Sequence, residues 1–173
     1  MTTPASPRRL GWLVTLLVVG GILAVWFWLY WPHRHQIAFQ PHMPDLALLA
    51  RQPAQVQLHI AAALTALLLG TIQLIGVKGT TAHRVIGWTW VVAMAVTAVS
   101  SLFIRQINGG AFSFIHLLSG WTIIALPMAV YAARRHRVAA HRRGMTGMFV
   151  GGLIVAGLLT FLPGRLMYQM FFG

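Results

Sequence analysis

Four histidines lie near the starts of four consecutive apolar segments, and the nitrogen atoms of imidazole bind metal ions. They are His59, His83, His116 and His141. Ionisable residues within membrane segments are rare and indicate functional sites. Because successive helices of a bundle run in opposite directions, the four histidines are expected to form two pairs, one near each end. His59 joins His116 in the first pair, and His83 joins His141 in the second.

Two histidines on facing helices suit b-type haem, because its iron takes a neutral imidazole nitrogen at each axial position. Each of the four has Gly or Ala three or four residues later, on its own side of the helix, which leaves room for a planar cofactor. Continued steps of three and four residues place Gly70 on the side of His59, and Ile123 and Pro127 on the side of His116. The pattern predicts two haem b groups with the four histidines as ligands of the haem iron. Zinc or copper is an alternative, although no carboxylate or thiol accompanies the pairs to complete a small-metal site.

Two plainer interpretations stay open at this point. Small residues also allow helices to pack closely within a membrane, whether or not a cofactor is bound. Histidine is amphipathic, and all four lie near helix ends, where such side chains are tolerated at the membrane interface.

Haem propionates are anionic, so a haem near a membrane face needs cations beside it. Two arginines directly follow the histidines of the second pair, and two more lie in the segments at the opposite end. They are Arg84, Arg142, Arg51 and Arg105. We expect these four to contribute to cofactor binding.

The elements that hold these residues are predicted to be transmembrane helices. Of the 173 residues, 58% are apolar and 8% are charged, and the mean hydropathy is +0.74. A soluble domain carries roughly 25% charged residues, and a helix needs ~20 mainly apolar residues to cross the bilayer. The composition predicts an all-α integral membrane helical bundle of about five transmembrane helices, four of which form the core.

Apolar runs and turn signals predict the boundaries of these helices. Gly79 and the threonines after it are expected to stop one helix and cap the next. A short helix lying on the membrane is expected between Asp45 and Arg51, and the stretch 165–173 is expected at the interface. The predicted transmembrane helices cover about residues 10–31, 55–77, 83–104, 112–133 and 144–162, and an Arg-rich loop is expected over residues 134–143. Residues 1–54 would form an anchor and an extracytoplasmic loop, and residues 55–173 the membrane core.

The charge of the chain predicts its partner and its orientation. Thirteen Lys and Arg stand against one acid, Asp45, which gives a net charge of +12. The cations lie between apolar runs and not along one helix, which favours a lipid bilayer and argues against nucleic acid. More of them fall on the side of the N-terminus, so we expect a multi-pass protein of the bacterial cytoplasmic (inner) membrane with a cytoplasmic N-terminus. The absence of cysteine excludes disulfides and thiolate ligands.

Several motifs resemble those of a known family. Residues 78–88 match KGT-x-x-HR-x-x-GW, and residues 112–119 match FS-x-IHLLS. Residues 141–145 match HRR-x-M, and residues 156–165 match AG-x-x-TF-x-PGR. From Leu58 to Gly173 the chain therefore resembles the domain of unknown function 2306 (DUF2306), a family of predicted bacterial membrane proteins with no settled activity.

The histidine layout is also similar to that of the cytochrome b561 superfamily, in which four core helices carry two bis-histidine haems. That resemblance implies the same two ligand pairs, His59 with His116 and His83 with His141. The ligands here lie within the first turn or two of their helices, closer to water than a buried haem requires. No motif for ascorbate or ferric ions is present, which leaves the electron donor and acceptor open.

The leading hypothesis is a di-haem b-type cytochrome that moves electrons across the membrane, with a quinone or another redox protein as partner. A cofactor-free scaffold or accessory subunit is the alternative, in which the histidines and arginines shape interfaces and lipid contacts. A small transporter is a third reading, favoured by polar residues within the helices and by Pro127, but no intramembrane carboxylate is present to couple protons. The polar residues are Thr65, Gln73, Thr97, Ser100 and Ser101.

Overall fold

The structure is a computed structural model that describes residues 40–104 and 114–173. The chain divides into two compact units. In the described part of the first unit, the backbone N–H of Gln40 donates to the carbonyl of Phe172 at 3.2 Å. The second unit, His42–Phe171, contains the four histidines. The predicted helix 10–31 and Arg105 lie outside the described residues.

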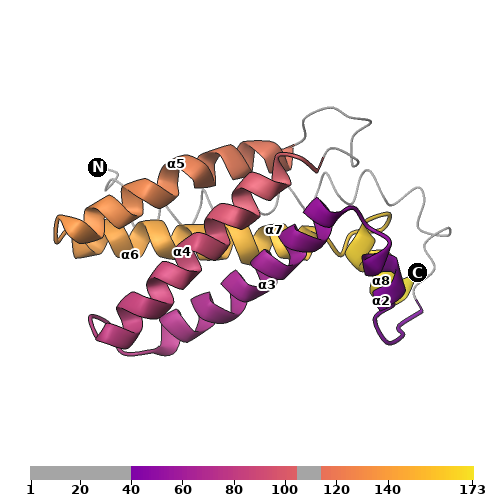
Figure 1. The fold of residues 1–173 in the computed structure, drawn as a ribbon, viewed down its shortest axis with the longest axis horizontal. Helices are drawn as coiled ribbons and strands as arrows, with labels where there is room; N and C mark the ends of the chain where they lie inside the picture. The colour runs from indigo at the N-terminus through magenta and orange to yellow at the C-terminus, as the bar shows by residue number, and fades with distance from the viewer. Residues whose placement is uncertain (1–39, 105–113) are drawn as a thin grey trace, which may run out of the picture. The chain divides into compact units, whose positions relative to one another are not determined.

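The described part of the second unit is a bundle of helices without strands (Figure 1). Helix α3 packs on α4, α4 on α5, and α5 on α6, and η3 contacts both α3 and α5. This arrangement confirms the predicted all-α fold and the helical bundle. The three long helices are α3 (Ala54–Ile75), α4 (Thr81–Ser101) and α5 (Phe114–Arg134). A fourth, continuous segment consists of α6 (Val138–Gly147), η3 (Met148–Val155) and α7 (Ala156–Leu159).

Three of these helices are long and apolar enough to cross a membrane: α3, α4 and, over residues 115–134, α5. Their outer sides carry large apolar side chains, such as Leu64, Leu68 and Val92, each about three-fifths exposed. In water such a surface would favour aggregation, whereas lipid tails cover it without cost. Helix α5 continues past Pro127, so the proline does not break it.

The turn between α3 and α4 forms as its sequence predicts. Thr80 is the N-cap of α4, and its hydroxyl accepts a hydrogen bond from the backbone N–H of His83 at 3.1 Å. Gly79 has φ +80°, a left-handed conformation that L side chains rarely adopt. Helix α3 ends at Ile75, slightly before the predicted boundary, with Gly76 as its C-cap.

The prediction of an Arg-rich loop up to residue 143 is wrong. Helix α5 is closed by His136, which has φ +56°, and by a hydrogen bond of 2.8 Å from the N–H of Arg137 to the carbonyl of Ala132. These are the features of a helix C-terminus that turns sharply. Helix α6 starts directly afterwards at Val138. Arg142 therefore lies on a helix, directly after His141.

The last core segment is not a regular α-helix, contrary to the prediction for residues 144–162. Residues Met148–Val155 form a π-helix between α6 and α7. Segments of π-helix are rare and often occur at functional sites, because the wider turn rotates the side chains that follow it. Gly151 and Gly152 lie within this segment, where their lack of side chains offers little resistance to the wider turn.

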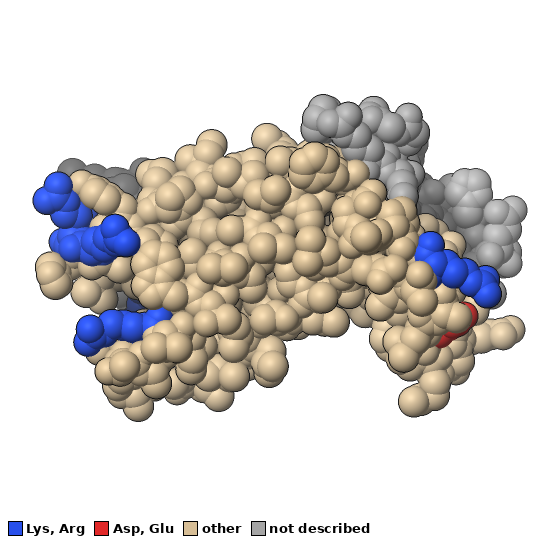
Figure 2. Space-filling model, in the orientation of Figure 1, with Lys and Arg blue, Asp and Glu red and all other residues tan. Residues whose placement is uncertain are grey.

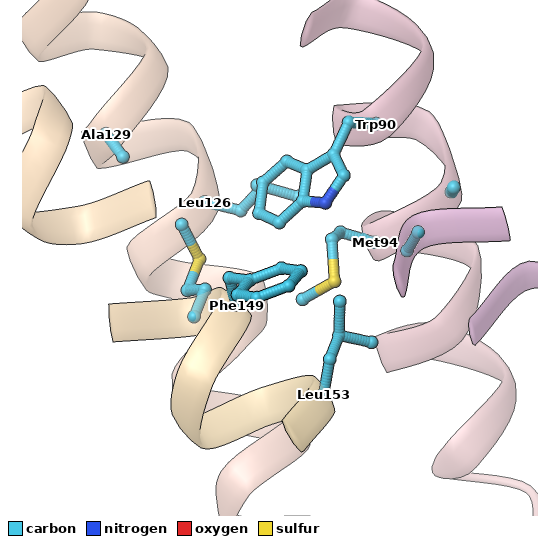
Figure 3. Close-up of a cluster of buried hydrophobic side chains, with 9 residues drawn as sticks. Trp90, Met94, Leu126, Ala129, Phe149 and Leu153 are labelled. Carbon is cyan, nitrogen blue, oxygen red and sulfur yellow. The ribbon is translucent and has the colours of Figure 1, made fainter. Parts of the chain in front are cut away.

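The centre of the bundle is filled by Trp90 and Met94 from α4 and Phe149 from η3, all at least nine-tenths buried (Figure 3). Gly70 on α3 faces this cluster. A Cβ atom at Gly70 would overlap the Phe149 ring and lie 2.8 Å from Nε1 of Trp90. Glycine at this position is therefore required by close packing.

Two short helices pair beside the main bundle. Asp45, the only acid of the chain, caps α2 (Leu46–Ala50) by accepting from the N–H of Ala47 at 2.9 Å. The backbone N–H of Asp45 donates to the carbonyl of Met170 in α8 (Leu166–Phe172) at 3.0 Å. The short helix predicted between residues 45 and 51 is confirmed.

Candidate functional site

His59 is half-buried on α3, and its imidazole bonds to α4. Its Nδ1 lies 3.0 Å from the carbonyl oxygen of Thr97 and 3.1 Å from the hydroxyl oxygen of Ser100. A carbonyl only accepts, so Nδ1 carries the proton and donates it to Thr97. In the neutral ring, Nε2 then keeps its lone pair.

His141 repeats this arrangement on α6, at the opposite end of the bundle. Its Nδ1 lies 3.0 Å from the carbonyl oxygen of Ala129 on α5. The same reasoning assigns the proton to Nδ1 and the lone pair to Nε2. Two of the four predicted ligands are thus anchored through Nδ1 to the backbone of a neighbouring helix.

His83 lies near the start of α4, at the same end as His141. The Nδ1 atom of His83 is buried and has no hydrogen-bond partner among the described residues. The carbonyl of His83 accepts a hydrogen bond of 2.7 Å from the amide of Gln73 on α3. The structure therefore brings the second predicted pair to one end of the bundle.

His116 is 6% exposed and lies on the inner face of α5. The prediction that Ile123 and Pro127 share this face is wrong, because Ile123 is 38% exposed and Pro127 is also exposed. The inner face turns along the helix mostly by steps of three residues, whereas the prediction alternated steps of four and three. The buried positions are His116, Ser119, Thr122, Leu126, Ala129 and Ala132.

Several hydroxyl groups of α4 and α5 are buried inside the bundle at the same end as His116, and we call them the hydroxyl layer. The Oγ atoms of Ser101 and Ser119 form a hydrogen bond that joins α4 to α5. The hydroxyl of each member of the layer also lies within hydrogen-bond distance of a carbonyl on its own helix, three or four residues earlier. The hydroxyl layer consists of Thr97, Ser100, Ser101, Ser119 and Thr122, all at most 8% exposed. The end of the bundle that holds it, where α3 and α5 begin and α4 ends, is the hydroxyl end.

The sequence interpretation missed Ser119 and Thr122 as parts of the site. A signal was present, because both follow His116 at steps of three residues on the same face of α5. Hydroxyl groups at that spacing, beside an inward histidine, indicate a polar layer within the membrane core.

The cations gather at the opposite end, which we call the basic end. Figure 2 shows Lys and Arg at the two ends of the helices and none on the visible surface between them. Of the arginines predicted to bind the cofactor, Arg84 and Arg142 are exposed at the basic end, and Arg51 is exposed beyond the hydroxyl end. The basic end comprises Lys78, Arg84, Arg134, Arg135, Arg137, Arg142 and Arg143.

The geometry yields two histidine sites separated by a packed apolar centre. The carbonyl of Thr97 accepts the hydrogen bond from His59. At 1.5 Å per residue, Thr97 lies about 21 Å along α4 from His83. The described residues contain no group of three or more His, Cys, Asp or Glu that is able to hold a metal ion. The specific pairing of the histidines stays a prediction.

Comparison with known proteins identifies the membrane core. The family described as Predicted membrane protein (DUF2306) matches residues 56–171, which is more than half of the chain. No curated protein and no solved structure matches the chain. The predicted similarity to cytochrome b561 thus stays a prediction, while the predicted family is confirmed. The chain belongs to the DUF2306 family of predicted membrane proteins.

Proposed function

We propose that this membrane protein is a b-type cytochrome that binds two haems and moves electrons between the two faces of the membrane. The observation that carries the proposal is the hydrogen bond from Nδ1 of His59 to Thr97, repeated by His141 and Ala129 at the other end. A histidine that binds a metal almost always donates its other N–H to a carbonyl or carboxylate, which fixes the tautomer and the ring. Here that arrangement occurs once at each end.

The donor set fits haem better than a small metal ion. A haem iron needs only two axial ligands from the protein, and neutral imidazoles serve well. A small ion such as zinc needs three or four ligands, and the only carboxylate side chain of the chain caps α2. The Nδ1 atom of His83 is buried and has no hydrogen-bond partner in the described part of the chain, so a ring nitrogen of this histidine is not engaged by another described residue.

His59 with His116, and His83 with His141, would hold the two haems, and Arg84, Arg142 and Arg51 would neutralise their propionates. Arg105 has the same proposed role but lies outside the described residues. When bound, haem iron supplies one-electron transfer. Trp90, Met94 and Phe149 would keep water out of the centre and hold the two sites apart. A quinone or another redox protein is the proposed partner.

A reduced-minus-oxidised visible spectrum of the full chain, purified from cells supplied with haem, tests this function. We expect two haems per chain, with His59→Ala and His83→Ala each removing one. His42→Ala, at an exposed histidine outside the bundle helices, is the matched control and should keep both. An iron-free, colourless preparation, or loss of neither haem in the two variants, contradicts the proposal.

A second candidate is a cofactor-free scaffold or accessory subunit, and the packing around its glycines favours it. The small residues on the same side as the histidines were expected to leave room for a cofactor. Instead, Phe149 and Trp90 occupy the space beside Gly70, and a Cβ at Gly144 would lie 2.9 Å from that of Ala129. In a scaffold, Gln at each of the four histidine positions would leave the folded fraction unchanged and the preparation colourless. The same spectra decide between the two candidates.

We also propose that the basic end faces the cytoplasm of a bacterium, because cations are retained on that side of the inner membrane. The chain has no cysteine, so single cysteines can report orientation without background. A membrane-impermeant maleimide should label Ala50→Cys in intact spheroplasts and Arg137→Cys only after lysis. The opposite pattern reverses the orientation.

A further inference from the structure

Two arginines at the end of α5 are held against aromatic rings. The Cζ atom of Arg134 lies 5.7 Å from the ring centroid of Trp88 on α4. The Cζ atom of Arg135 lies 5.4 Å from the ring centroid of Tyr131, and its Nε donates to the Tyr131 hydroxyl at 2.9 Å. Cation–π contact and this hydrogen bond both restrict where the guanidinium groups can lie.

These contacts leave the anion-binding part of Arg135 available. A guanidinium group has five N–H donors in a planar fork, and Nε is used here by Tyr131. The two terminal nitrogens match the oxygen spacing of a phosphate and bind it through two parallel hydrogen bonds. The only acidic side chain of the chain, Asp45, caps α2 beyond the opposite end of the bundle. An anion for these arginines must therefore come from outside the side chains of this protein.

The surroundings of the two rings favour a lipid over a soluble anion. Trp88 is 51% exposed and Tyr131 is 55% exposed. Each continues a stripe of exposed apolar residues at helical spacing that runs away from the arginines along α4 or α5. On α4 the stripe includes Val92 and Val99, and on α5 it includes Met128, Ile124, Trp121 and Leu117. Acyl chains would cover these stripes, which places a phosphate group level with the arginines.

We propose that Arg134 and Arg135, oriented by Trp88 and Tyr131, bind the headgroup of an anionic phospholipid. The site lies on the outer surface of α4 and α5, and it uses none of the residues assigned to haem. Other cations of the basic end add attraction to an anionic membrane surface without this orientation. Lys78 contributes least, because its Nζ already donates to the carbonyls of Leu74 and Gly76 at 2.7 Å each.

Native mass spectrometry of the full chain with equimolar phosphatidylglycerol and phosphatidylcholine tests the site. We expect the protein to retain phosphatidylglycerol preferentially. Arg134→Gln with Arg135→Gln should lower this preference roughly tenfold, because it removes the two oriented guanidinium groups that bind the phosphate through hydrogen bonds. Arg137→Gln with Arg143→Gln removes the same charge from the same end and is the matched control, expected to keep most of the preference.

Tyr131→Phe separates orientation from charge. It keeps the ring and the net charge but removes the hydroxyl that accepts from Arg135, so we expect the preference to fall by roughly half or more. Equal losses in the two double variants would overturn the proposal in favour of unspecific attraction. Displacement of phosphatidylglycerol by excess inorganic phosphate would overturn it in favour of a soluble anion, and so would the absence of any preference in the unmodified protein.

Discussion

The two ends of the bundle use the same residue, histidine, in opposite surroundings. At the hydroxyl end, His59 bonds to a carbonyl and lies beside a layer of buried hydroxyl groups, which carry no charge. At the basic end, His83 and His141 lie among exposed lysine and arginine side chains. Neutral polar groups dominate one end, and uncompensated positive charge dominates the other.

This difference assigns different partners to the two ends. The buried hydroxyl groups of the hydroxyl end already bond to helix carbonyls, so they need no partner from outside. The cations of the basic end have no acidic side chain of their own chain beside them, so an anion from outside the chain, such as the proposed phospholipid, would balance them. The comparison predicts that stability depends mainly on close helix packing at the basic end and on hydrogen bonds between helices at the hydroxyl end.

The largest effect is expected where α5 and α6 meet at the basic end. A Cβ at Gly144 would lie 2.9 Å from Cβ of Ala129, whose carbonyl anchors His141. Gly144→Ala should therefore destabilise the protein by about 1–3 kcal/mol, the usual cost of overpacking. It should also disturb the His141 anchor. The free energy of unfolding in an SDS titration, made in mixed micelles, measures the first effect.

Gly120→Ala is the matched control at the hydroxyl end. Gly120 lies four residues after His116 and Gly144 three residues after His141, but a Cβ at Gly120 meets no described atom within 4 Å. The substitution should be neutral, or stabilising by up to about 1 kcal/mol because alanine favours the helix. Equal losses of stability in Gly144→Ala and Gly120→Ala would contradict the proposed difference in packing between the two ends.

A smaller effect is expected from the cap of α4 at the basic end. Thr80→Ala removes the acceptor for the N–H of His83, and loss of such a cap costs about 1 kcal/mol. Thr81→Ala changes the next residue, which is exposed and makes no cap bond, and should stay within about 0.5 kcal/mol. The same SDS titration measures both, and a Thr81→Ala loss as large as that of Thr80→Ala would remove the role of the cap.

Much of this fold could be predicted because a membrane restricts the choice of structure. Long apolar runs have to be helices, and the glycine and threonine of the α3–α4 turn mark where one helix stops and the next begins. The placement of His83 and His141 at one end follows from helix direction alone. The inward faces of α3 and α4 also follow from spacing, since Ala66, Trp90 and Met94 are buried as their positions require.

Features that depend on contacts between helices could not be predicted. The inner face of α5 turns differently from the expected stripe, which left Ser119 and Thr122 unrecognised. The π-helix at Met148–Val155 arises within an apolar run that has no distinguishing pattern. The Nδ1 bond of His141 joins it to a carbonyl, and every residue has a carbonyl, so residue types give no sign of which one is used.

The smallest effect concerns the bond that joins α4 to α5 at the hydroxyl end. Ser119→Ala removes its hydrogen bond to Ser101, and hydrogen bonds between membrane helices contribute about 0.6 kcal/mol on average. Thr65→Ala is the matched control, because that exposed hydroxyl donates only to the carbonyl of Ala61 on its own helix. It should change the free energy of unfolding by less.

A double-mutant cycle with Ser101→Ala and Ser119→Ala isolates the pair, since the bonds of each serine to its own helix cancel. A coupling free energy of about 0.6 kcal/mol means that polar contacts hold the hydroxyl end together. A coupling near zero means that side-chain packing holds this end as it holds the basic end. The two ends would then differ only in charge, and the hydroxyl layer would lose its structural role.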